Sequence, residues 1–456
     1  MSCNFIFKGK KISKVGFFGF GSSNRALIDY LKGRFTDLSF VLRSDTKKTD
    51  TSGFSKTYFG KDARLDISED VLFFSPSVKR DAPEFVDAQK NGTILSSDVE
   101  FFFEFKKIPV LSVTGSDGKS TTATLSSMML SDSLGPFPAS ANIGTPIASI
   151  LGKEEIVGTV AELSSFQLMN FRPKSKRALI TNVTENHLDW HCDLDEYVRA
   201  KENVLEKAEE RIFNLDCPIS SKFTEKYPAY AVYSSRLPFS EMRKKYQAEH
   251  YFSDENGCIL HSGEKLIEKN KLIFSEPHNV INFIAATALT CELVTYKSIL
   301  KAAENFSPLR HRCEKIGTFD GITFYDSSAD STPARTKITL SSFKTPTVLI
   351  LGGRSKRVSY LSLFPLPDCV KAVVITGENS DEIKKALFSQ RRVITGRLPI
   401  FYAEPFSEAV FTAINLASPG DAVLLSPAST SFDSFDNYAA RGLFFSDTVK
   451  KYYAEK

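Results

Sequence analysis

One segment, residues 113–122, constrains what this chain can fold into more than any other. It reads V-T-G-S-D-G-K-S-T-T, follows the apolar run at 108–111, and precedes a helical pattern rich in Ala, Leu and Met. A strand, a glycine loop and a helix in that order predict a phosphate-binding loop, because the loop amides and the helix N-terminus face the same anion. We therefore expect a parallel α/β sheet with a nucleotide at its edge.

The loop residues have distinct expected tasks. Gly115 and Gly118 let the backbone approach a polyphosphate closely, Lys119 can reach the terminal phosphates, and Ser120 can offer a hydroxyl to Mg²⁺. The spacing G-x-x-G-K-S-T is two residues shorter than the common G-x-x-x-x-G-K-[ST]. A turn of this composition also fits a plain connection between a strand and a helix, so the motif alone leaves both interpretations open.

Composition narrows the class of protein. The 456 residues suffice for about three domains, and 42% hydrophobic with 25% charged residues is typical of a soluble globular chain. A net charge of +4 over the whole length argues against a nucleic-acid or membrane surface, and we interpret the 38 Phe residues as core filling. The seven cysteines are scattered without a C-x-x-C pair, which argues against a disulfide framework or a zinc cluster. With no signal-peptide core or 18-residue apolar span, we expect a cytoplasmic protein.

The order of strand and helix patterns predicts three tandem α/β domains. The first, 1–107, has strand patterns at 15–18, 38–42 and 71–74 and a helix at 26–31, and is Rossmann-like. Its G-x-G turn at 19–21 lacks a third glycine, so nucleotide binding and a simple tight turn are equally compatible with it. The second, 108–307, is a P-loop domain with strands at 158–161 and 178–183, helices at 194–208 and 279–293, and a small β region at 227–273. The third, 308–456, is Rossmann-like, with buried parallel strands at 348–351, 372–375 and 422–425.

Two polar segments follow strands of the second domain. Glu162 stands at the end of the first strand in A-E-L-S-S-F-Q-L and can bind Mg²⁺ beside the loop, although an acid and cap serines at a helix start explain it equally well. His187, in N-V-T-E-N-H-L-D-W-H, lies among polar residues just past the next strand, which favours a metal or phosphate ligand.

These segments together resemble the D-glutamate-adding ligases of the Mur ligase family, within the superfamily that includes folylpolyglutamate synthase. Later segments agree with the same family in order: P-H-N-V-I-N at 277–282, P-L-R-H-R-C-E at 308–314, L-G-G-R-S-K at 351–356 and S-P-A-S-T-S-F-D at 426–433. The S-S-F-Q and S-P-A-S-T-S-F-D segments are more specific to this branch than the loop, which the whole superfamily shares. The resemblance spans all three predicted domains.

The resemblance implies which residues bind ATP and two Mg²⁺ ions. The phosphates would be held by Gly115, Ser116, Asp117, Gly118, Lys119, Ser120 and Thr121. The Mg²⁺ ligands would be Ser120, Glu162, His187 and Lys201. Adenine and the rest of ATP would be contacted by Asn279, Asn282, Arg312 and Asp326. Lys119, Glu162, His187 and Lys201 are the expected catalytic residues.

Lys201 would act as a carbamate, because it matches the lysine that such ligases modify. A neutral amine in a desolvated pocket can capture CO₂, and the resulting anion can support the second Mg²⁺. The composition of its helix alone favours an ordinary exposed lysine on an amphipathic helix. The substrate contacts implied by the resemblance are Ser22, Ser23, Asn142, Ser164, Gln167, Lys356, Ser431 and Tyr438.

Five residues depart from the family pattern. Ser328 stands where a lysine is common, and we expect Arg335 or Lys337 to supply the missing cation. Arg43 and Ser44 replace an acidic residue near the uracil, Ser77 replaces a glycine, and Asn186 replaces an aspartate.

The implied activity is ATP-dependent addition of D-glutamate to UDP-N-acetylmuramoyl-L-alanine through an acyl phosphate, in peptidoglycan precursor synthesis. Positioning and charge neutralisation would carry this chemistry, and closure of the third domain would exclude water. The partners would be small molecules, with no nucleic acid or membrane, and we expect a monomer. The alternatives are another amide ligase of the superfamily and a non-catalytic nucleotide-binding regulator with the same fold.

Overall fold

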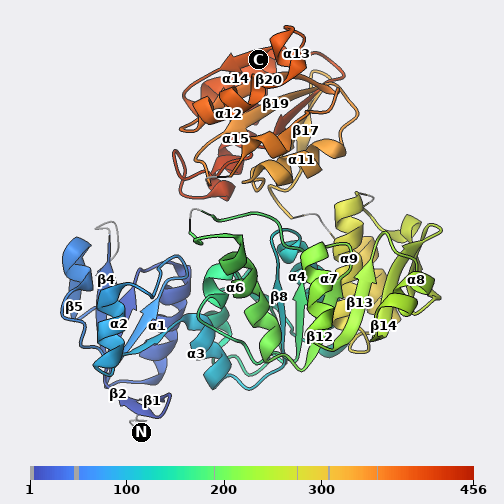
Figure 1. Ribbon diagram of the computed structural model, residues 1–456. Helices are drawn as coiled ribbons and strands as arrows, with labels where there is room; N and C mark the ends of the chain where they lie inside the picture. Colours follow the sequence, from blue (N-terminus) through green and yellow to red (C-terminus); the bar gives the residue numbers. More distant parts are fainter. Residues whose placement is uncertain are drawn as a thin grey trace. The chain divides into compact units, whose positions relative to one another are not determined.

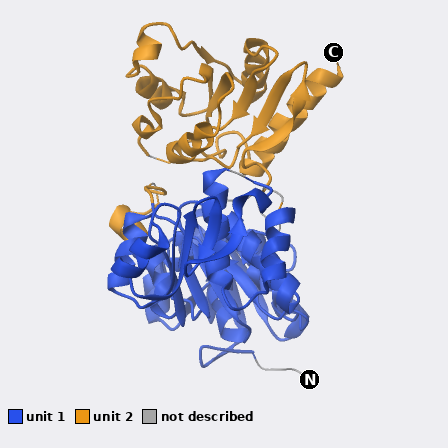
Figure 2. Cartoon of the chain, turned by 90° about the vertical axis from the view of Figure 1, so that its right-hand side faces the viewer, with its two compact units in different colours: residues 1–183, 198–305 blue, residues 184–197, 306–456 orange. Residues whose placement is uncertain are grey.

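Runs of consecutive apolar residues form the central strands of three sheets that are mostly parallel, which is the pattern expected where helices cover both faces (Figure 1). The computed structural model describes residues 5–45, 51–188, 190–274, 276–306, 309–356 and 358–455. The predicted α/β class is confirmed. Contacts divide the chain into two compact units, residues 1–183 with 198–305 and residues 184–197 with 306–456 (Figure 2).

The first sheet has five parallel strands in the order β5-β4-β3-β6-β7. Its strands are β3 Lys14–Phe18, β4 Ser39–Ser44, β5 Lys56–Phe59, β6 Val71–Phe74 and β7 Ile94–Ser96. Its helices are α1 Ser22–Arg34, α2 Pro83–Lys90 and α3 Asp98–Phe105, and a short antiparallel hairpin, β1 Phe5–Phe7 with β2 Lys10–Ile12, precedes it. The prediction that Phe fills the core is confirmed here, because Phe73 and Phe101 are fully buried and pack edge to face with ring centroids 5.7 Å apart.

The second sheet has nine strands in the order β16-β15-β14-β13-β12-β11-β8-β10-β9. The seven parallel strands are β8 Val110–Thr114, β9 Ala139–Ala141, β10 Thr159–Glu162, β11 Arg177–Ile180, β12 Glu210–Asn214, β13 Ala229–Ser234 and β14 Ala248–Glu255. The antiparallel edge consists of β15 Cys258–His261 and β16 Glu264–Glu268. The small β region predicted at 227–273 is therefore no separate layer, since β13 and β14 continue the parallel sheet.

The helices connected to this sheet are α4 Lys119–Leu134, α5 Ser165–Leu168, α6 Leu194–Glu206, α7 Pro218–Lys222, α8 Phe239–Lys245, α9 Pro277–Thr290 and α10 Tyr296–Asn305. Helix α4 packs against α9 and α10 and contacts β8 and β10. The phosphate loop and the N-terminal half of α9 are brought together by this packing.

The third sheet has six strands in the order β17-β18-β22-β19-β20-β21, of which only the β17–β18 pair is antiparallel. Its strands are β17 Glu314–Phe319, β18 Ile322–Asp326, β19 Thr347–Gly352, β20 Val370–Thr376, β21 Ile400–Tyr402 and β22 Ala422–Leu425. Its helices are α11 Pro333–Ser341, α12 Ser380–Leu387, α13 Arg391–Ile394, α14 Phe406–Leu416 and α15 Tyr438–Ala454. The strands predicted at 348–351, 372–375 and 422–425 are confirmed as parts of β19, β20 and β22.

The boundaries predicted at 107/108 and 307/308 stay predictions. The first two sheets belong to one compact unit, and residues 307 and 308 lie outside the described residues, as do Cys3 and Asp189. Among the helices in the described ranges, none combines the length and the apolar character needed to cross a membrane.

Candidate active site

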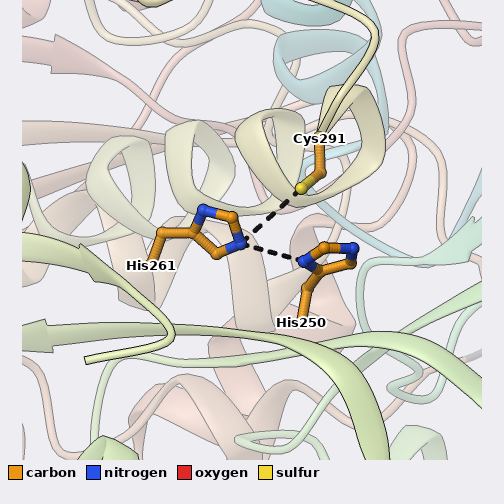
Figure 3. A group of neighbouring side chains, drawn as sticks. All are labelled: His250, His261 and Cys291. Carbon is orange, nitrogen blue, oxygen red and sulfur yellow. Dashed lines mark hydrogen bonds between the residues drawn. The ribbon is translucent and has the colours of Figure 1, made fainter. Parts of the chain in front are cut away.

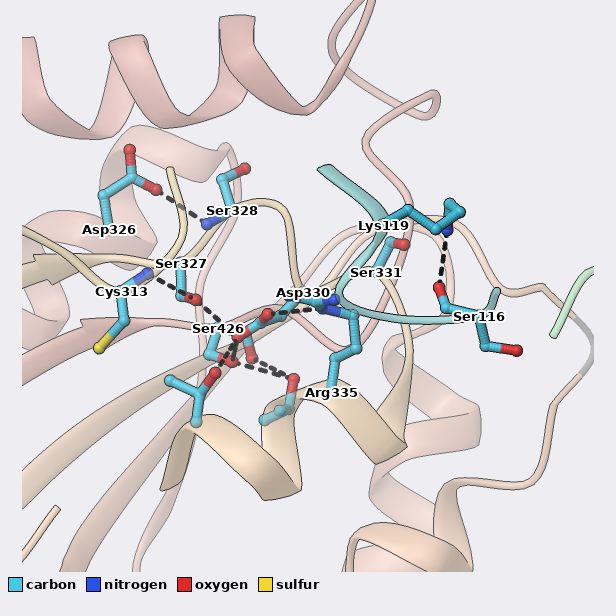
Figure 4. Close-up of polar contacts among 12 residues, drawn as sticks. Ser116, Lys119, Cys313, Asp326, Ser327, Ser328, Asp330, Ser331, Arg335 and Ser426 are labelled. Carbon is cyan, nitrogen blue, oxygen red and sulfur yellow. Dashed lines mark hydrogen bonds and ion pairs between the residues drawn. The ribbon is translucent and has the colours of Figure 1, made fainter. Parts of the chain in front are cut away.

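The segment between β8 and α4 has the backbone of a phosphate loop. Gly115 and Gly118 have φ values of +151° and +79°, which favour glycine. A Cβ atom on Gly115 would collide with the Thr181 hydroxyl, and one on Gly118 would collide with the Asn282 amide oxygen. Helix α4 begins at Lys119, whose Nζ donates to the Ser116 carbonyl at 2.9 Å (Figure 4). The amides of this loop therefore meet an anion at the N-terminus of a 16-residue helix.

Residues that follow the neighbouring strand β11 hold the phosphate loop by hydrogen bonds. The Asn182 backbone carbonyl accepts from the Ser116 amide at 2.8 Å, and the Asn182 side-chain oxygen accepts from the Asp117 amide at 2.8 Å. The Thr181 hydroxyl donates to the Asp117 carbonyl at 2.5 Å. These bonds hold the loop in one conformation, so little ordering is required when a ligand binds.

Glu162 ends β10 and is 1% exposed, while Ser120 lies in the first turn of α4 and is also buried. Glu162 Oε1 accepts from the Asn142 side-chain amide at 2.8 Å, whereas Glu162 Oε2 is buried with no hydrogen-bond partner in the described structure. A buried carboxylate oxygen of this kind suits a hard divalent cation, because leaving it unsatisfied costs free energy. The residues present therefore fit a Mg²⁺ ion.

Lys201 is the second lysine of this site. It lies on α6, is 2% exposed, and donates from Nζ to the Gly115 carbonyl at 2.6 Å. Burial, followed by the nearby charge of Lys119, holds the pKa of Lys201 well below its ordinary value. The expectation from helix composition, an exposed lysine, is wrong, because this face of α6 packs onto the loop.

Four of the five predicted substrate residues of the first unit line one cavity of about 560 Å³. Ser22 and Ser23 begin α1, Asn142 follows β9, and Gln167 lies on α5. Ser164 caps α5, since its side chain accepts from the Gln167 amide at 3.2 Å and the Gln167 side chain accepts from the Ser164 amide at 2.9 Å. This capping fixes the Gln167 side chain at the cavity wall.

Arg43 does not face this cavity. It is fully buried and paired with Glu69, with 3.0 Å between Arg43 Nη2 and Glu69 Oε1. The cavity is lined instead by Ser44, Asp45 and Ser77. Asp45 is an acidic residue at this wall that sequence reasoning missed, because the strand predicted to end at residue 42 continues two positions further, to Ser44.

The second unit gathers the residues expected to bind the amino acid. Lys356 is 7% exposed, and its Nζ donates to the Ser331 hydroxyl at 3.0 Å and to the Asn186 side-chain oxygen at 3.3 Å. Arg354 and Thr430 form an antiparallel β-bridge, in which the backbone amide of each donates to the carbonyl of the other. This bridge places the segment of Lys356 beside that of Ser431. Asn186 and Ser331 were not predicted as neighbours of this lysine, since they lie far from it in the sequence.

Asp326 ends β18 and is fully buried. Its Oδ2 lies 2.6 Å from His311 Nδ1, and its Oδ1 accepts from the Ser328 amide at 2.8 Å (Figure 4). The Ser328 hydroxyl donates to the Tyr438 carbonyl at 2.8 Å, so the start of α15 is tied to this loop.

The cation that contacts Ser328 is Arg441, and the prediction that Arg335 or Lys337 supplies the missing cation stays a prediction. Arg441 is 1% exposed, and its Nε donates to the Ser328 hydroxyl at 2.9 Å. Arg335 pairs with Asp330 at 3.2 Å, and Lys337 donates to the Ser362 carbonyl. Arg441 comes from a distant helix, and no local pattern connects it to position 328.

Comparisons with known proteins agree over the whole chain. The Mur ligase middle domain matches residues 113–290, and the Mur ligase glutamate ligase domain matches residues 311–429. UDP-N-acetylmuramoylalanine–D-glutamate ligases of Ruminiclostridium cellulolyticum and Acetivibrio thermocellus are each 35% identical, with 97% of this chain and 97% of each relative covered. The chain belongs to this ligase family. The predicted enzyme class, an ATP-dependent ligase, is confirmed with it.

Solved structures of Mur ligases share the fold. The UDP-N-acetylmuramate–alanine ligase of Thermotoga maritima has a TM-score of 0.62 at 19% identity and covers 97% of this chain and 100% of its own. A pseudomurein peptide ligase of Methanothermus fervidus has a TM-score of 0.61 at 18% identity, covering 96% and 99%.

The remaining predicted residues of the ligase occupy defined places. Asn279 lies on α9, where its side-chain nitrogen donates to Glu276 Oε2 at 3.2 Å. His187 belongs to the second unit and has a φ of +56°, and its carbonyl accepts from the amides of Trp190 and His191. Arg312 lies just before β17, and Tyr438 begins α15 with 44% of its surface exposed.

Proposed function

We propose that this chain joins D-glutamate to UDP-N-acetylmuramoyl-L-alanine at the expense of ATP, in the synthesis of the peptidoglycan precursor. The observation that carries the proposal is the pair of buried residues Lys201 and Glu162, together with Lys119, around a phosphate loop with two left-handed glycines. Relatives that share 32–35% of their residues with this chain bear the name of that reaction. Small substrates, a cytoplasmic location and a monomeric state form part of the same proposal.

The reaction proceeds in two displacements. A carboxylate oxygen of the L-alanine moiety attacks the γ-phosphorus of ATP, and ADP leaves. The amine of D-glutamate then attacks the acyl carbon, and the tetrahedral intermediate collapses to the amide with loss of phosphate and a proton. Lys119 and the loop amides neutralise charge that develops on the transferred phosphoryl group, which supplies the positioning that phosphoryl transfer needs.

Mg²⁺ would be held by Ser120 and Glu162, and the family resemblance adds His187 and the carbamate of Lys201 as ligands. When bound, such ions neutralise phosphate charge and polarise the transferred group. The unpaired Oε2 of Glu162 supports the first assignment. Because burial lowers the pKa of Lys201, it favours the neutral amine, which can add CO₂ and lose a proton to become a carbamate, the anionic form that a metal requires.

The substrates are assigned to separate groups of residues. Nucleotide-sugar recognition falls to Ser22, Ser23, Asn142, Ser164 and Gln167, and we add Asp45 to these. Adenine and the remainder of ATP are assigned to Asn279, Asn282, Arg312 and Asp326. The carboxylates of D-glutamate are assigned to Lys356, Ser431 and Tyr438, because a cation and hydroxyl donors recognise carboxylates directionally.

The proposal is tested by phosphate release from ATP with UDP-N-acetylmuramoyl-L-alanine and a panel of amino acids. We expect release with D-glutamate, and much less with L-glutamate, L-lysine or meso-diaminopimelate. The Lys119→Ala variant should retain its fold and lose turnover, since the cation meets charge that grows in the transition state. A preference for a diamino acid, or near-wild-type turnover in Lys119→Ala, would contradict the proposal.

A further inference from the structure

Three side chains that the ligase reaction does not use meet at the edge of the second sheet. His250 lies on β14, His261 ends β15, and Cys291 caps the C-terminus of α9 (Figure 3). In the sheet order, β13, β12 and β11 separate β14 from the loop strand β8, so this group is distinct from the candidate active site. The register pairs Phe252 with His261, which puts His250 and His261 on the same face of the sheet.

The three potential ligand atoms converge. His250 Nδ1 lies 3.0 Å from His261 Nε2, and Cys291 Sγ lies 3.7 Å from the same His261 nitrogen. All three atoms lie within 4.8 Å of one another. Ordinary zinc–nitrogen and zinc–sulfur bonds in a tetrahedron give about 3.3 Å between two nitrogens and about 3.6 Å between nitrogen and sulfur. The two measured edges are within a few tenths of an ångström of those values.

A second group of side chains holds these ligands in place. His250 Nε2, the nitrogen that faces away from His261, lies 3.7 Å from Glu292 Oε2, and Tyr230 donates to that carboxylate oxygen at 3.0 Å. Arg177 donates to the Cys291 carbonyl at 2.5 Å and to the Tyr230 hydroxyl at 2.8 Å. At 3.7 Å the Glu292 carboxylate is beyond hydrogen-bond distance of His250, but it is the near partner that can orient this imidazole when a metal binds.

The surroundings also suit a metal. A cavity of about 170 Å³ adjoins the group and is lined by His261, Cys291 and Glu292 together with apolar side chains. Burial, followed by the neighbouring His250, lowers the pKa of the His261 imidazole and keeps it neutral. Burial raises the pKa of the Cys291 thiol to about 11, so the thiol keeps its proton until a metal displaces it.

We propose that His250, His261 and Cys291 form a Zn²⁺ site, with Glu292 orienting His250 and a fourth position open to water. Two imidazoles and a thiolate are the ligand set that borderline-soft Zn²⁺ prefers. The ion would clamp the β14–β15 hairpin to the end of α9, the helix whose opposite half carries Asn279 and Asn282. Its role is structural and independent of the proposed ligase reaction.

The experiment measures Zn²⁺ affinity by competition with a chromophoric chelator, using the full chain without a histidine tag. Loss of a residue that only orients a metal ligand weakens metal affinity by roughly 10–100-fold, and we expect a loss of this size in Glu292→Gln. Cys291→Ser and His261→Gln each remove a ligand and should weaken Zn²⁺ affinity by more than that. Cys258→Ser is the matched control, because Cys258 lies on β15 with His261 but is not one of the three proposed ligands. This variant should bind Zn²⁺ like the wild type. Circular dichroism and melting of metal-free protein check that each variant folds.

Cobalt spectroscopy separates this site from the other group of possible ligands, His311, Glu314 and Asp326, which contains no sulfur. We expect a sulfur-to-cobalt charge-transfer band in the wild type and in Cys258→Ser, and its loss in Cys291→Ser. A wild type without this band, or one that binds Zn²⁺ no more tightly than Cys291→Ser and His261→Gln, would show that the three side chains form only a hydrogen-bonded group.

Discussion

The buried Arg43–Glu69 ion pair of the first sheet yields the most quantitative stability prediction. Both side chains of the Arg43–Glu69 pair are 0% exposed. Arg43 donates to both Glu69 oxygens at 3.0–3.2 Å and to the carbonyls of Ala63, Leu65 and Asp66 at 2.8–3.1 Å. Replacing Arg43 with Met would leave the Glu69 carboxylate buried without its cation.

Breaking a buried pair in this way costs about 3–5 kcal/mol, which corresponds to an opening equilibrium raised by roughly 10²–10⁴-fold. We expect this loss in Arg43→Met and a large recovery in Arg43→Met/Glu69→Leu, because the double variant leaves neither charge buried. Lys90→Met removes an exposed pair with Asp87 at 3.3 Å and should change little.

Hydrogen–deuterium exchange with mass spectrometry is the suitable assay, because it reports opening of individual strands in a chain with two compact units. Peptides from β4 and β6 should lose protection in Arg43→Met, while those from β19 and β20 should not change. Equal exchange in Arg43→Met and Lys90→Met, or a double variant no better protected than the single one, would refute the reasoning.

Three further predictions concern the remaining charged groups. Lys201→Ala should be nearly inactive, and added short carboxylic acids should partly restore turnover by replacing the carbamate; full activity without additives would reduce Lys201 to a structural lysine. Lys356→Ala should raise the KM for D-glutamate strongly with little change in the KM for ATP, and equal losses for both substrates in steady-state kinetics would contradict the assignment. Burial raises the pKa of Asp98 to about 6 from an ordinary 3.8, so the native state binds this proton more tightly and stability falls as pH rises between these values. In urea unfolding, the free energy of unfolding of Asp98→Asn should therefore exceed that of the wild type by up to about 3 kcal/mol above pH 6 and by little near pH 4. A difference between the two proteins that does not change with pH would argue against titration of Asp98.

The sequence predicted what local patterns encode. Consecutive apolar residues identified β6, β19, β20 and β22, and the loop motif predicted a helix after residue 122, which in the structure is α4 and already begins at Lys119. These features depend on neighbours in the chain, so propensity and periodicity suffice for them. Helix α1 begins at Ser22, four residues before the predicted start, because polar residues in a first helical turn carry no apolar period.

Contacts between distant segments could not be predicted. Arg441 lies 113 residues from Ser328, and Asn186 lies 170 residues from Lys356. The histidines and cysteine of the proposed zinc site lack metal-binding spacing in the sequence, and they meet only because β14, β15 and the end of α9 converge. Helix composition alone favours an exposed Lys201 for the same reason, since burial of that helix face depends on tertiary packing.

The fate of one oxygen atom tests the central claim, that the reaction passes through an acyl phosphate, most directly. UDP-N-acetylmuramoyl-L-alanine labelled with oxygen-18 in the L-alanine carboxylate is incubated with ATP, D-glutamate and the enzyme, and the released phosphate is analysed by mass spectrometry. If the carboxylate attacks the γ-phosphorus, each phosphate released in amide formation carries one carboxylate oxygen and therefore one oxygen-18. Phosphate without the label, formed together with the D-glutamyl product, would contradict the proposed mechanism.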